Sequence, residues 1–265
     1  MKTIVFSDVD GTLLNSEHQM SKKTREAIIA LGEKDIPFVI VSARSPSGIY
    51  PILKKNHFHS SIIAYSGGLI LDDDGQVIES RGFDIKTGKA ILQFIKEHQF
   101  ACTPNIYSGD DWIVEDRSDP RVQREERIVE AEARNGSIDD LPEDAVINKI
   151  LCMCDPTQTL SIEKALKEQF KNVNIAKSSD ILIEINGLNI TKAHAVKMIC
   201  KLKGIDEKDA IAFGDNFNDE DMLKCVGHPF LMANAPQELL DMIPHHTLSN
   251  DEDGIPYALK QIGLI

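Results

Sequence analysis

Residues 3–16 read TIVFSDVDGTLLNS. In this stretch an apolar run leads into two acids, Asp8 and Asp10, and then directly into Gly11 and Thr12. Carboxylates this close repel each other unless a bound cation or a basic partner offsets their charge. The stretch therefore predicts a buried strand that ends at a charged site.

Two further apolar runs, residues 38–41 and 210–213, have the composition of buried parallel strands. Between the first two strands, residues 22–34 place apolar side chains on one helical face. This order predicts an α/β fold, a Rossmann-like, doubly wound parallel sheet. Ligands bind beyond the carboxyl ends of such strands, so the polar residues found there are expected to converge. These residues are Asp8, Ser42 and Asp215.

The pattern changes between residues 82 and 187, which predicts an inserted α+β domain there and a discontinuous core domain of residues 1–81 and 188–265. Within the insert we expect helices at 86–98, 119–134 and 157–170, a hairpin at 105–115, and strands at 146–154 and 180–185. The core is completed by a strand at 61–65, a hairpin at 69–80, and helices at 219–226, 236–243 and 255–262.

The overall composition narrows the class of protein. The chain has 265 residues, is 42% hydrophobic and carries a formal net charge of -13, which opposes non-specific nucleic-acid binding. No apolar run reaches the roughly 20 residues that span a bilayer, and the start lacks the pattern of a signal peptide. We therefore expect a cytoplasmic protein with no membrane or nucleic-acid partner.

The five cysteines are an odd number at irregular spacing, which does not indicate a disulfide framework. Cys152 and Cys154 would share one face of a strand, as metal ligands can. No second pair of Cys or His residues lies near them in the sequence, and free thiols are among the most buried side chains. We therefore interpret both as buried apolar thiols.

Several residues suit phosphoryl chemistry. A carboxylate can attack a phosphoryl group and carry it as an aspartyl phosphate, and Asp8 is placed for this step. A second carboxyl group nearby, Asp10, can supply and remove protons. Residues 214–219, GDNFND, add two carboxylates after another apolar strand, and these oxygen ligands suit Mg²⁺. Lys192, near the start of a predicted helix, and Ser42 are candidates to hold a phosphate.

Each feature also has a plain structural interpretation. The first acids could simply face water in a loop, and residues 214–219 could only cap the following helix. Lys192 or Ser42 taken singly would more often be an exposed surface residue. It is the whole set that favours a site.

The set resembles the haloacid dehalogenase superfamily of phosphohydrolases. Its first motif, Asp-x-Asp-Gly-Thr, is matched by residues 8–12, and the Ser or Thr that ends its second strand is matched by Ser42. Its third motif, a Lys often followed closely by Ala, is matched by Lys192 and Ala193, and its fourth, Gly-Asp-x-x-Asn-Asp, by residues 214–219. Residues 234–235 and 249–254 resemble the Cof-type branch, so the likeness spans nearly the whole chain.

This resemblance implies the roles of individual residues. Asp8 would be the nucleophile, Asp10 the general acid and base, and Mg²⁺ the cofactor; the inserted domain would be a cap that closes the site. The implied catalytic residues are Asp8, Asp10, Lys192 and Ser42, and the implied metal residues are Asp8, Asp10, Asp215 and Asp219. The implied phosphate-binding residues are Val9, Ser42, Ala43, Arg44, Lys192 and Asn218.

The implied function is a phosphatase acting on small phosphorylated metabolites, such as sugar phosphates. Two alternatives stay open: a phosphomutase-like phosphotransferase, and a regulatory module that binds Mg²⁺ and phosphate without turnover. Tyr107, Trp112 and Arg117 are hypothesised to line the leaving-group side, although they could instead only pack within the cap. The histidines His194, His245 and His246 are expected on the surface. The sequence leaves the oligomeric state open.

Overall fold

The computed structural model describes residues 2–265 and divides into two compact units. The first comprises the chain up to Ala43, Ile52–Ile78 and Thr191–Ile265, and the second comprises Arg44–Pro51 and Glu79–Ile190. The second unit thus includes the short segment Arg44–Pro51, which lies outside the insert expected at residues 82–187. That this insert acts as a cap stays a prediction.

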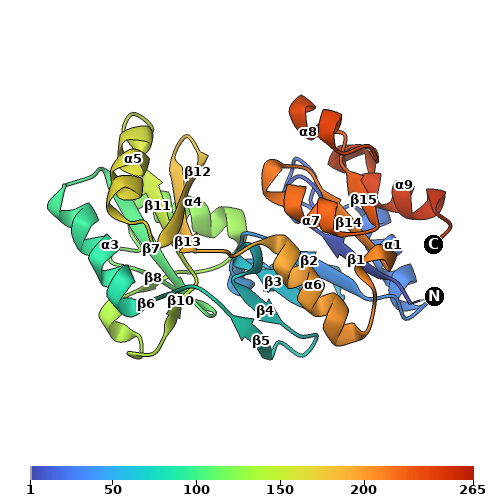
Figure 1. Cartoon of the computed structure of the whole chain (residues 1–265), viewed down its shortest axis with the longest axis horizontal. Helices are drawn as coiled ribbons and strands as arrows, with labels where there is room; N and C mark the ends of the chain where they lie inside the picture. Colours follow the sequence, from blue (N-terminus) through green and yellow to red (C-terminus); the bar gives the residue numbers. More distant parts are fainter. Residues whose placement is uncertain (1) are drawn as a thin grey trace. The chain divides into compact units, whose positions relative to one another are not determined.

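A seven-stranded sheet forms the first unit's scaffold (Figure 1). Its order is β15-β14-β1-β2-β3-β4-β5, parallel from β15 to β3, with β4 antiparallel to β3. In register, Phe6 lies opposite Ala212 on one side and Val39 on the other. The strands are β1 (Ile4–Ser7), β2 (Phe38–Val41), β3 (Ile62–Ala64), β4 (Leu69–Leu71), β5 (Val77–Ser80), β14 (Ala210–Gly214) and β15 (His228–Leu231).

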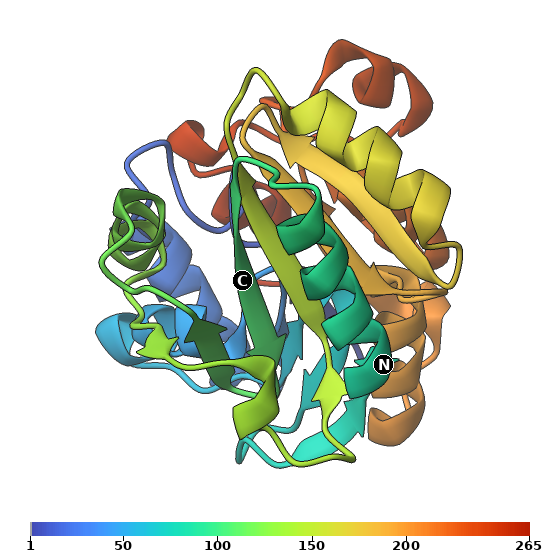
Figure 2. The ribbon, with the colours of Figure 1, turned by 90° about the vertical axis from the view of Figure 1, so that its left-hand side faces the viewer.

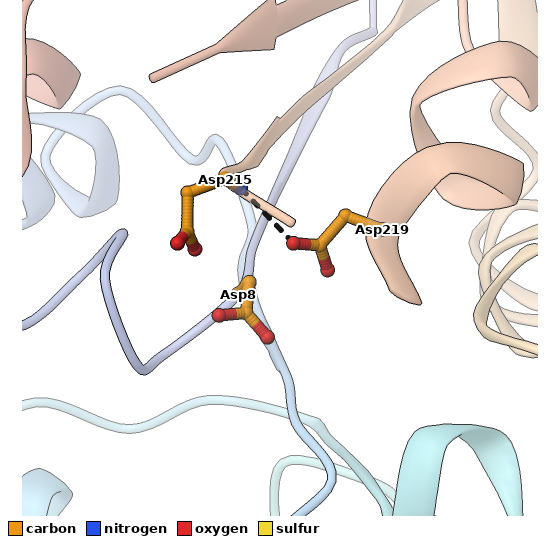
Figure 3. Close-up of side chains that lie close together, drawn as sticks. All are labelled: Asp8, Asp215 and Asp219. Atoms are coloured by element: carbon orange, nitrogen blue, oxygen red, sulfur yellow. Dashed lines mark hydrogen bonds between the residues drawn. The ribbon is translucent and has the colours of Figure 1, made fainter. Parts of the chain in front are cut away.

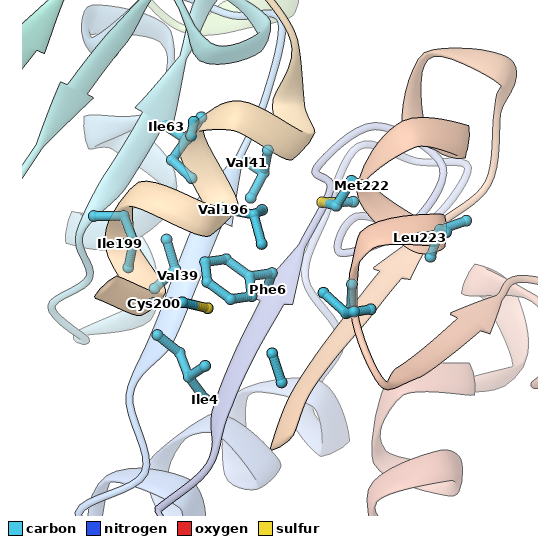
Figure 4. Packing of buried hydrophobic residues seen from close by; sticks show 14 of the residues in the cluster. Ile4, Phe6, Val39, Val41, Ile63, Val196, Ile199, Cys200, Met222 and Leu223 are labelled. Atoms are coloured by element: carbon cyan, nitrogen blue, oxygen red, sulfur yellow. The ribbon is translucent and has the colours of Figure 1, made fainter. Parts of the chain in front are cut away.

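Both faces of this sheet are buried, as expected for parallel strands. Ile4 and Phe6 pack in one cluster with Val196 of α6 and Met222 of α7 (Figure 4). Val5, which points to the opposite face, is equally buried. The helices of this layer are α1 (Lys22–Gly32), α2 (Tyr50–Asn56), α6 (Lys192–Lys203), α7 (Glu220–Cys225), α8 (Gln237–Met242) and α9 (Gly254–Gln261), of which α1 and α9 pack together. The predicted α/β class is confirmed.

The second unit has a six-stranded sheet of order β12-β13-β11-β7-β8-β9, antiparallel except between β8 and β9. Helices α3 (Ile85–Glu97) and α5 (Thr159–Gln169) lie on one face of it (Figure 2), where Ile91 and Ile162 pack on Ile150 of the sheet. The strands are β7 (Cys102–Ser108), β8 (Asp111–Val114), β9 (Arg134–Asn135), β11 (Lys149–Cys154), β12 (Val173–Ser179) and β13 (Leu182–Gly187); a two-stranded pair joins β6 (Phe83–Asp84) and β10 (Val146–Ile147).

One helix and one strand are shorter in the structure than the sequence predicts. The helix predicted at residues 119–134 is α4 (Pro120–Val129), because Glu130 adopts a left-handed conformation with φ 52° and the chain then enters β9. The strand predicted at 146–154 is interrupted at Asn148. Its backbone N–H still donates to Tyr107 O of β7 (2.9 Å), while its side-chain oxygen accepts from Gly109 N (2.7 Å) and its side-chain amide donates to the carbonyl of Arg81 (3.1 Å).

One helix and four strands were not predicted from the sequence: α2, β6, β9, β12 and β15. β15 contains Pro229, which cannot donate to a ladder and is tolerated because this strand lies at the sheet edge. β12 also lies at an edge, and the polar residues Asn174 and Ser178 at its exposed positions weaken the apolar signal. Among residues 2–265, no helix combines the length and apolarity needed to cross a bilayer.

Candidate active site

Three carboxylates point toward one another at the carboxyl edge of the parallel sheet (Figure 3). Asp8 follows β1, while Asp215 follows β14 and Asp219 ends the turn after it. Because β1 and β14 are parallel neighbours, their ends meet there, and Asp8 N donates to Phe213 O at 3.0 Å. One oxygen from each of the three carboxylates lies within 4.8 Å of the others. The predicted convergence of Asp8 and Asp215 is therefore observed.

Lys192 supplies the positive charge in this cluster. Its Nζ lies 2.6 Å from Asp8 Oδ1 and 2.5 Å from Asp219 Oδ1. The lysine is the first residue of α6, whose N-cap Thr191 accepts from the backbone N–H of His194. Its side chain is fully buried, so the ammonium group is dedicated to these carboxylates and not to solvent.

Asp219 shapes the turn that carries Asp215. Its Oδ2 accepts from the backbone N–H groups of Asp215 (3.0 Å) and Asn216 (3.1 Å). Gly214 makes this fold-back possible, since a Cβ there would lie 2.6 Å from Asp219 Cβ. Asp219 thus holds both Lys192 and the Asp215 turn with its two oxygens.

Gly11 and Thr12 bring the first motif against the fourth. Thr12 Oγ1 donates to Asp215 Oδ1 at 2.7 Å, a contact between residues far apart in the sequence. Gly11 has a φ of +81°, and a Cβ on it would lie 2.3 Å from Asp215 Oδ2. Only glycine meets both demands, the left-handed backbone and the close approach.

The charges in the cluster shift one another's protonation. Burial raises the pKa of Asp8, Asp219 adds to the rise, and Lys192 opposes it. Burial likewise raises the pKa of Asp215 to about 6, against the hydrogen bond from Thr12. Burial would lower the pKa of Lys192, but the carboxylates of Asp219 and Asp8 outweigh it and raise the pKa. The protein thus gathers more negative than positive charge here, which a cation would relieve.

The donor set fits a hard divalent cation. Carboxylate oxygens of Asp8 and Asp215 face one another, and Mg²⁺ prefers such oxygen ligands. Asp10 has an exposed side chain on the same loop, two residues beyond Asp8. Asp219 is a less direct candidate, because its oxygens already serve Lys192 and the backbone of the turn.

Ser42 lies at the end of β2, where the neighbouring loop is strained. Ser42 is buried, and its carbonyl accepts from Ser66 N at 2.8 Å. Tyr65 and Ser66 both have positive φ values, 51° and 56°, and Gly67 follows with φ +105°. A Cβ on Gly67 would lie 2.4 Å from Thr191 O, so this loop packs against the residue before Lys192. Such strain is typical of functional loops.

The other predicted phosphate ligands are placed differently. The Val9 carbonyl accepts from Leu13 N and Leu14 N at 3.0 and 2.9 Å, which closes the turn after Asp8. Asn218 is exposed in the turn between Asp215 and Asp219. Ala43 follows Ser42 in the first unit, whereas Arg44 belongs to the second, where its guanidinium donates to Gly48 O at 3.3 Å.

The role of Asn234 was not predicted from the sequence. Its side-chain amide donates to Gly11 O at 2.9 Å, and its side-chain oxygen accepts from Asn250 N at 3.1 Å. Asn250 in turn donates to Leu14 O at 2.9 Å. The two asparagines therefore hold both ends of the loop Gly11–Leu14, and only their inclusion in the family-like motifs marked them beforehand.

Tyr107 and Trp112 are buried in the second unit and stack with ring centroids 5.6 Å apart. Trp112 Nε1 donates to Asn105 Oδ1 at 2.9 Å, and Arg117 pairs with Glu126 at 2.6 Å. These contacts support the packing alternative, and a role in substrate recognition stays a prediction. His245 and His246 are exposed as expected, and His194 is half-buried.

Comparison with known proteins gives this site its context. The family model of the haloacid dehalogenase-like hydrolases matches residues 5–259. The chain belongs to this family. A Haemophilus influenzae protein named "Putative phosphatase" is 34% identical over 98% of both chains. A Bacillus subtilis 5-amino-6-(5-phospho-D-ribitylamino)uracil phosphatase is 28% identical over 99% of this chain and 98% of its own.

Solved structures agree with the haloacid dehalogenase-like assignment. A haloacid dehalogenase-like hydrolase from Bacteroides thetaiotaomicron superposes with a TM-score of 0.90 at 25% identity, covering 99% of this chain and 100% of the other. A Thermotoga maritima protein also reaches 0.90, at 26% identity and with 99% and 98% coverage. The resemblance seen in the motifs is confirmed, and the chain is a hydrolase of phosphoric monoesters.

Proposed function

We propose that this protein is a Mg²⁺-dependent phosphatase that hydrolyses small phosphorylated metabolites through an aspartyl phosphate on Asp8. The observation that carries the proposal is the contact of Asp8 with buried Lys192, beside the carboxylates of Asp215 and Asp219. A carboxylate held by an ammonium group at the edge of a parallel sheet is oriented for attack. The hydrolase class follows from the family; the residue roles are our assignment.

In the first half-reaction, a carboxylate oxygen of Asp8 forms a bond to phosphorus. The bond between phosphorus and the ester oxygen breaks, and its electron pair stays on that oxygen. Asp10 donates a proton to the leaving oxygen, so that an alcohol departs. Lys192 favours the ionised form of Asp8, against the effect of burial, and holds its carboxylate in position through a 2.6 Å contact.

In the second half-reaction, water attacks the phosphorus of the aspartyl phosphate. Asp10, now ionised, takes the proton from that water, which returns Asp10 to its starting state. The bond between phosphorus and Asp8 breaks, releasing inorganic phosphate and the free carboxylate. An acid that works in both halves must reach water, and the exposed side chain of Asp10 supports this role.

We assign the cation to Asp8, the backbone carbonyl of Asp10, and Asp215, with Asp219 holding the turn around them. When bound, Mg²⁺ neutralises phosphate oxygens and relieves the repulsion among the carboxylates. Thr12 orients Asp215 for this task. Its hydroxyl donates to Oδ1, which also fixes the direction in which Oδ2 points.

The substrate phosphate would be held by backbone, hydroxyl, guanidinium, ammonium and amide donors that follow β1 and β2, begin α6 and lie on the fourth motif. We assign these contacts to Val9, Ser42, Ala43, Arg44, Lys192 and Asn218.

Residues 82–187 would act as the cap that contacts the leaving group. Sugar phosphates are the first substrates to test, and the B. subtilis relative adds a phosphorylated ribityl compound. We place the enzyme in the cytoplasm, which its unpaired cysteines support.

Phosphate release from p-nitrophenyl phosphate and a panel of sugar phosphates tests the proposal. Wild type is compared with Asp8→Asn, each with Mg²⁺ and with chelator. Turnover that requires Mg²⁺ and falls to background in the variant would support the proposal. Equal turnover in both proteins would remove Asp8 from the mechanism. Mg²⁺ and phosphate binding without turnover of any ester would instead favour the regulatory module.

A further inference from the structure

The second unit brings Cys102, which is distant in the sequence, close to Cys152 and Cys154. Cys102 begins β7, and Cys152 and Cys154 lie near the end of β11. Cys102 packs against the hydrophobic cluster that contains Cys152 and Cys154. The sequence indicated only the Cys152 and Cys154 pair and no third thiol beside it. None of these residues belongs to the proposed phosphatase site.

Strand register makes Cys102 and Cys154 direct partners. They face each other across the antiparallel ladder of β7 and β11. Asp155 N donates to Ala101 O at 2.8 Å, so Ala101 and Asp155 form a hydrogen-bonded pair. Because hydrogen-bonded and non-hydrogen-bonded pairs alternate along an antiparallel ladder, Cys102 and Cys154 form a non-hydrogen-bonded pair. Consistently, Cys154 N donates away from β7, to Ile181 O at 2.7 Å.

This kind of pair suits a disulfide. At a non-hydrogen-bonded position of an antiparallel ladder the two Cα atoms are about 4.5 Å apart and the side chains lie on the same face. Disulfides accept Cα separations of about 4.4–6.8 Å, so closure needs little backbone movement. Cys152 instead lies opposite Pro104 and is fully buried, which makes it the poorer partner for Cys102.

A small oxidant can reach the pair. Cys102 is half-buried and lines a cavity of about 580 Å³. The apolar lining of this cavity includes Leu92, Ile95, Phe100, Pro104, Ile106 and Ile138. Hydrogen bonding to Cys152 raises the pKa of Cys102, and hydrogen bonding to Cys102 raises that of Cys154, with Arg121 opposing both shifts. Both thiols are therefore mainly protonated at neutral pH, and closure is expected to be slow.

We propose that Cys102 and Cys154 are a reversible oxidation site that closes to a cross-strand disulfide. Cys102 thiolate attacks one sulfur of a low-molecular-weight disulfide, whose other sulfur leaves as a thiolate and takes a proton. Cys154 thiolate then attacks Cys102 sulfur in the mixed disulfide and expels the second small thiol, which takes the other proton. The two protein thiols lose two electrons in total, and the small disulfide gains them.

Peptide mapping of the full chain tests this site. The native protein is treated with excess oxidised glutathione, its remaining thiols are alkylated in denaturant, and the disulfide-linked peptides are identified before and after reduction. The expected result is one dominant, reducible link between Cys102 and Cys154. A dominant link of Cys102 to Cys152, lasting glutathione on Cys102, or no oxidation of either residue would overturn the proposal.

Two cysteine variants test which thiol is the partner of Cys102. Cys154→Ser should leave Cys102 as a stable mixed disulfide, whereas Cys225→Ser, which removes a half-buried thiol of the first unit, should leave the link unchanged. If Cys154→Ser does not fold, the peptide map of the oxidised wild-type protein is sufficient to identify the linked cysteines. A link that forms as well in Cys154→Ser as in wild type would show that another thiol is the partner.

Discussion

Lys192 Nζ bridges Asp8 Oδ1 at 2.6 Å and Asp219 Oδ1 at 2.5 Å, with all three side chains buried. The ammonium group is therefore shared between a candidate nucleophile and the residue that shapes the metal-facing turn. A buried cation between two buried carboxylates costs desolvation on every partner, and its removal leaves uncompensated charge. This relationship ties the stability of the fold to the chemistry of the site.

Replacing Lys192 by methionine should lower stability strongly. We expect Lys192→Met to reduce the free energy of unfolding by about 3 kcal/mol, because Asp8 and Asp219 lose the partner of a buried ion pair. Urea unfolding in the presence of chelator measures this. The control is Lys203→Met on the same helix, whose partner Asp73 lies at 2.9 Å in an exposed pair. That change should cost less than about 1 kcal/mol. Equal losses in the two variants would show that the buried ion pair of Lys192 contributes no more than an exposed one.

Replacing Gly11 by alanine should weaken cation binding. The added Cβ would meet Asp215 Oδ2 at 2.3 Å, so Asp215 or the loop must move. We expect the Mg²⁺ concentration for half-maximal phosphatase activity to rise by about 10-fold or more. Gly75→Ala is the control, because Gly75 has a similar φ of +77° but open space around it. It should cost about 1 kcal/mol of stability and leave the Mg²⁺ dependence unchanged.

The two asparagines that hold the Gly11–Leu14 loop should act together. Asn234→Ala removes the bond to Gly11 O, and Asn250→Ala removes the bond to Leu14 O. Because Asn250 N also donates to Asn234, we expect each change to lower kcat and the double change to be less than additive, with a coupling of about 0.5–3 kcal/mol. Steady-state kinetics of the four proteins measures it; additive effects would show that the asparagines act independently.

The strands of the central sheet and the main charged residues of the site could be predicted from the sequence. β1, β2 and β14 could be predicted because all their residues are buried, so their apolar runs are continuous. The meeting of Asp8 with Asp215 followed from the parallel order of those strands. The contacts of Thr12 with Asp215 and of Asn234 with Gly11 could not be predicted, since nothing local records which distant group a single polar side chain will reach.

Contacts between residues far apart in the sequence could not be predicted in the second unit either. Cys102 lies beside Cys154 only because β7 pairs with β11 in one particular register, and register depends on the whole sheet. The end of α4 was misjudged because its charged residues continue past Val129, while the chain turns at Glu130. Helix propensity does not record such a turn.

Asp119 should make stability depend on pH in the acid range. Hydrogen bonds from Arg121 and Thr103 lower the pKa of Asp119 to about 2, from 3.8 when unfolded. Its contribution is therefore fully present above pH 3.8 and is lost as pH falls toward 2. Because Arg121 is partly exposed, we expect Asp119→Asn, which keeps a helix cap, to cost about 1 kcal/mol at pH 7.

Urea unfolding of wild type and Asp119→Asn at pH 7, 4 and 3 measures this dependence. The stability difference should shrink as the pH falls. A difference that stays constant would mean that the charge of Asp119 contributes nothing and that only its shape and cap matter.

Trapping the intermediate shows whether the phosphoryl group is transferred to Asp8. The Asp10→Asn variant is mixed with p-nitrophenyl phosphate and Mg²⁺, because this leaving group departs without an acid while hydrolysis of the aspartyl phosphate still needs a base. The reaction is quenched, reduced with borohydride and mapped by mass spectrometry. We expect homoserine in place of aspartate at position 8. A burst of p-nitrophenol with position 8 unmodified would contradict it.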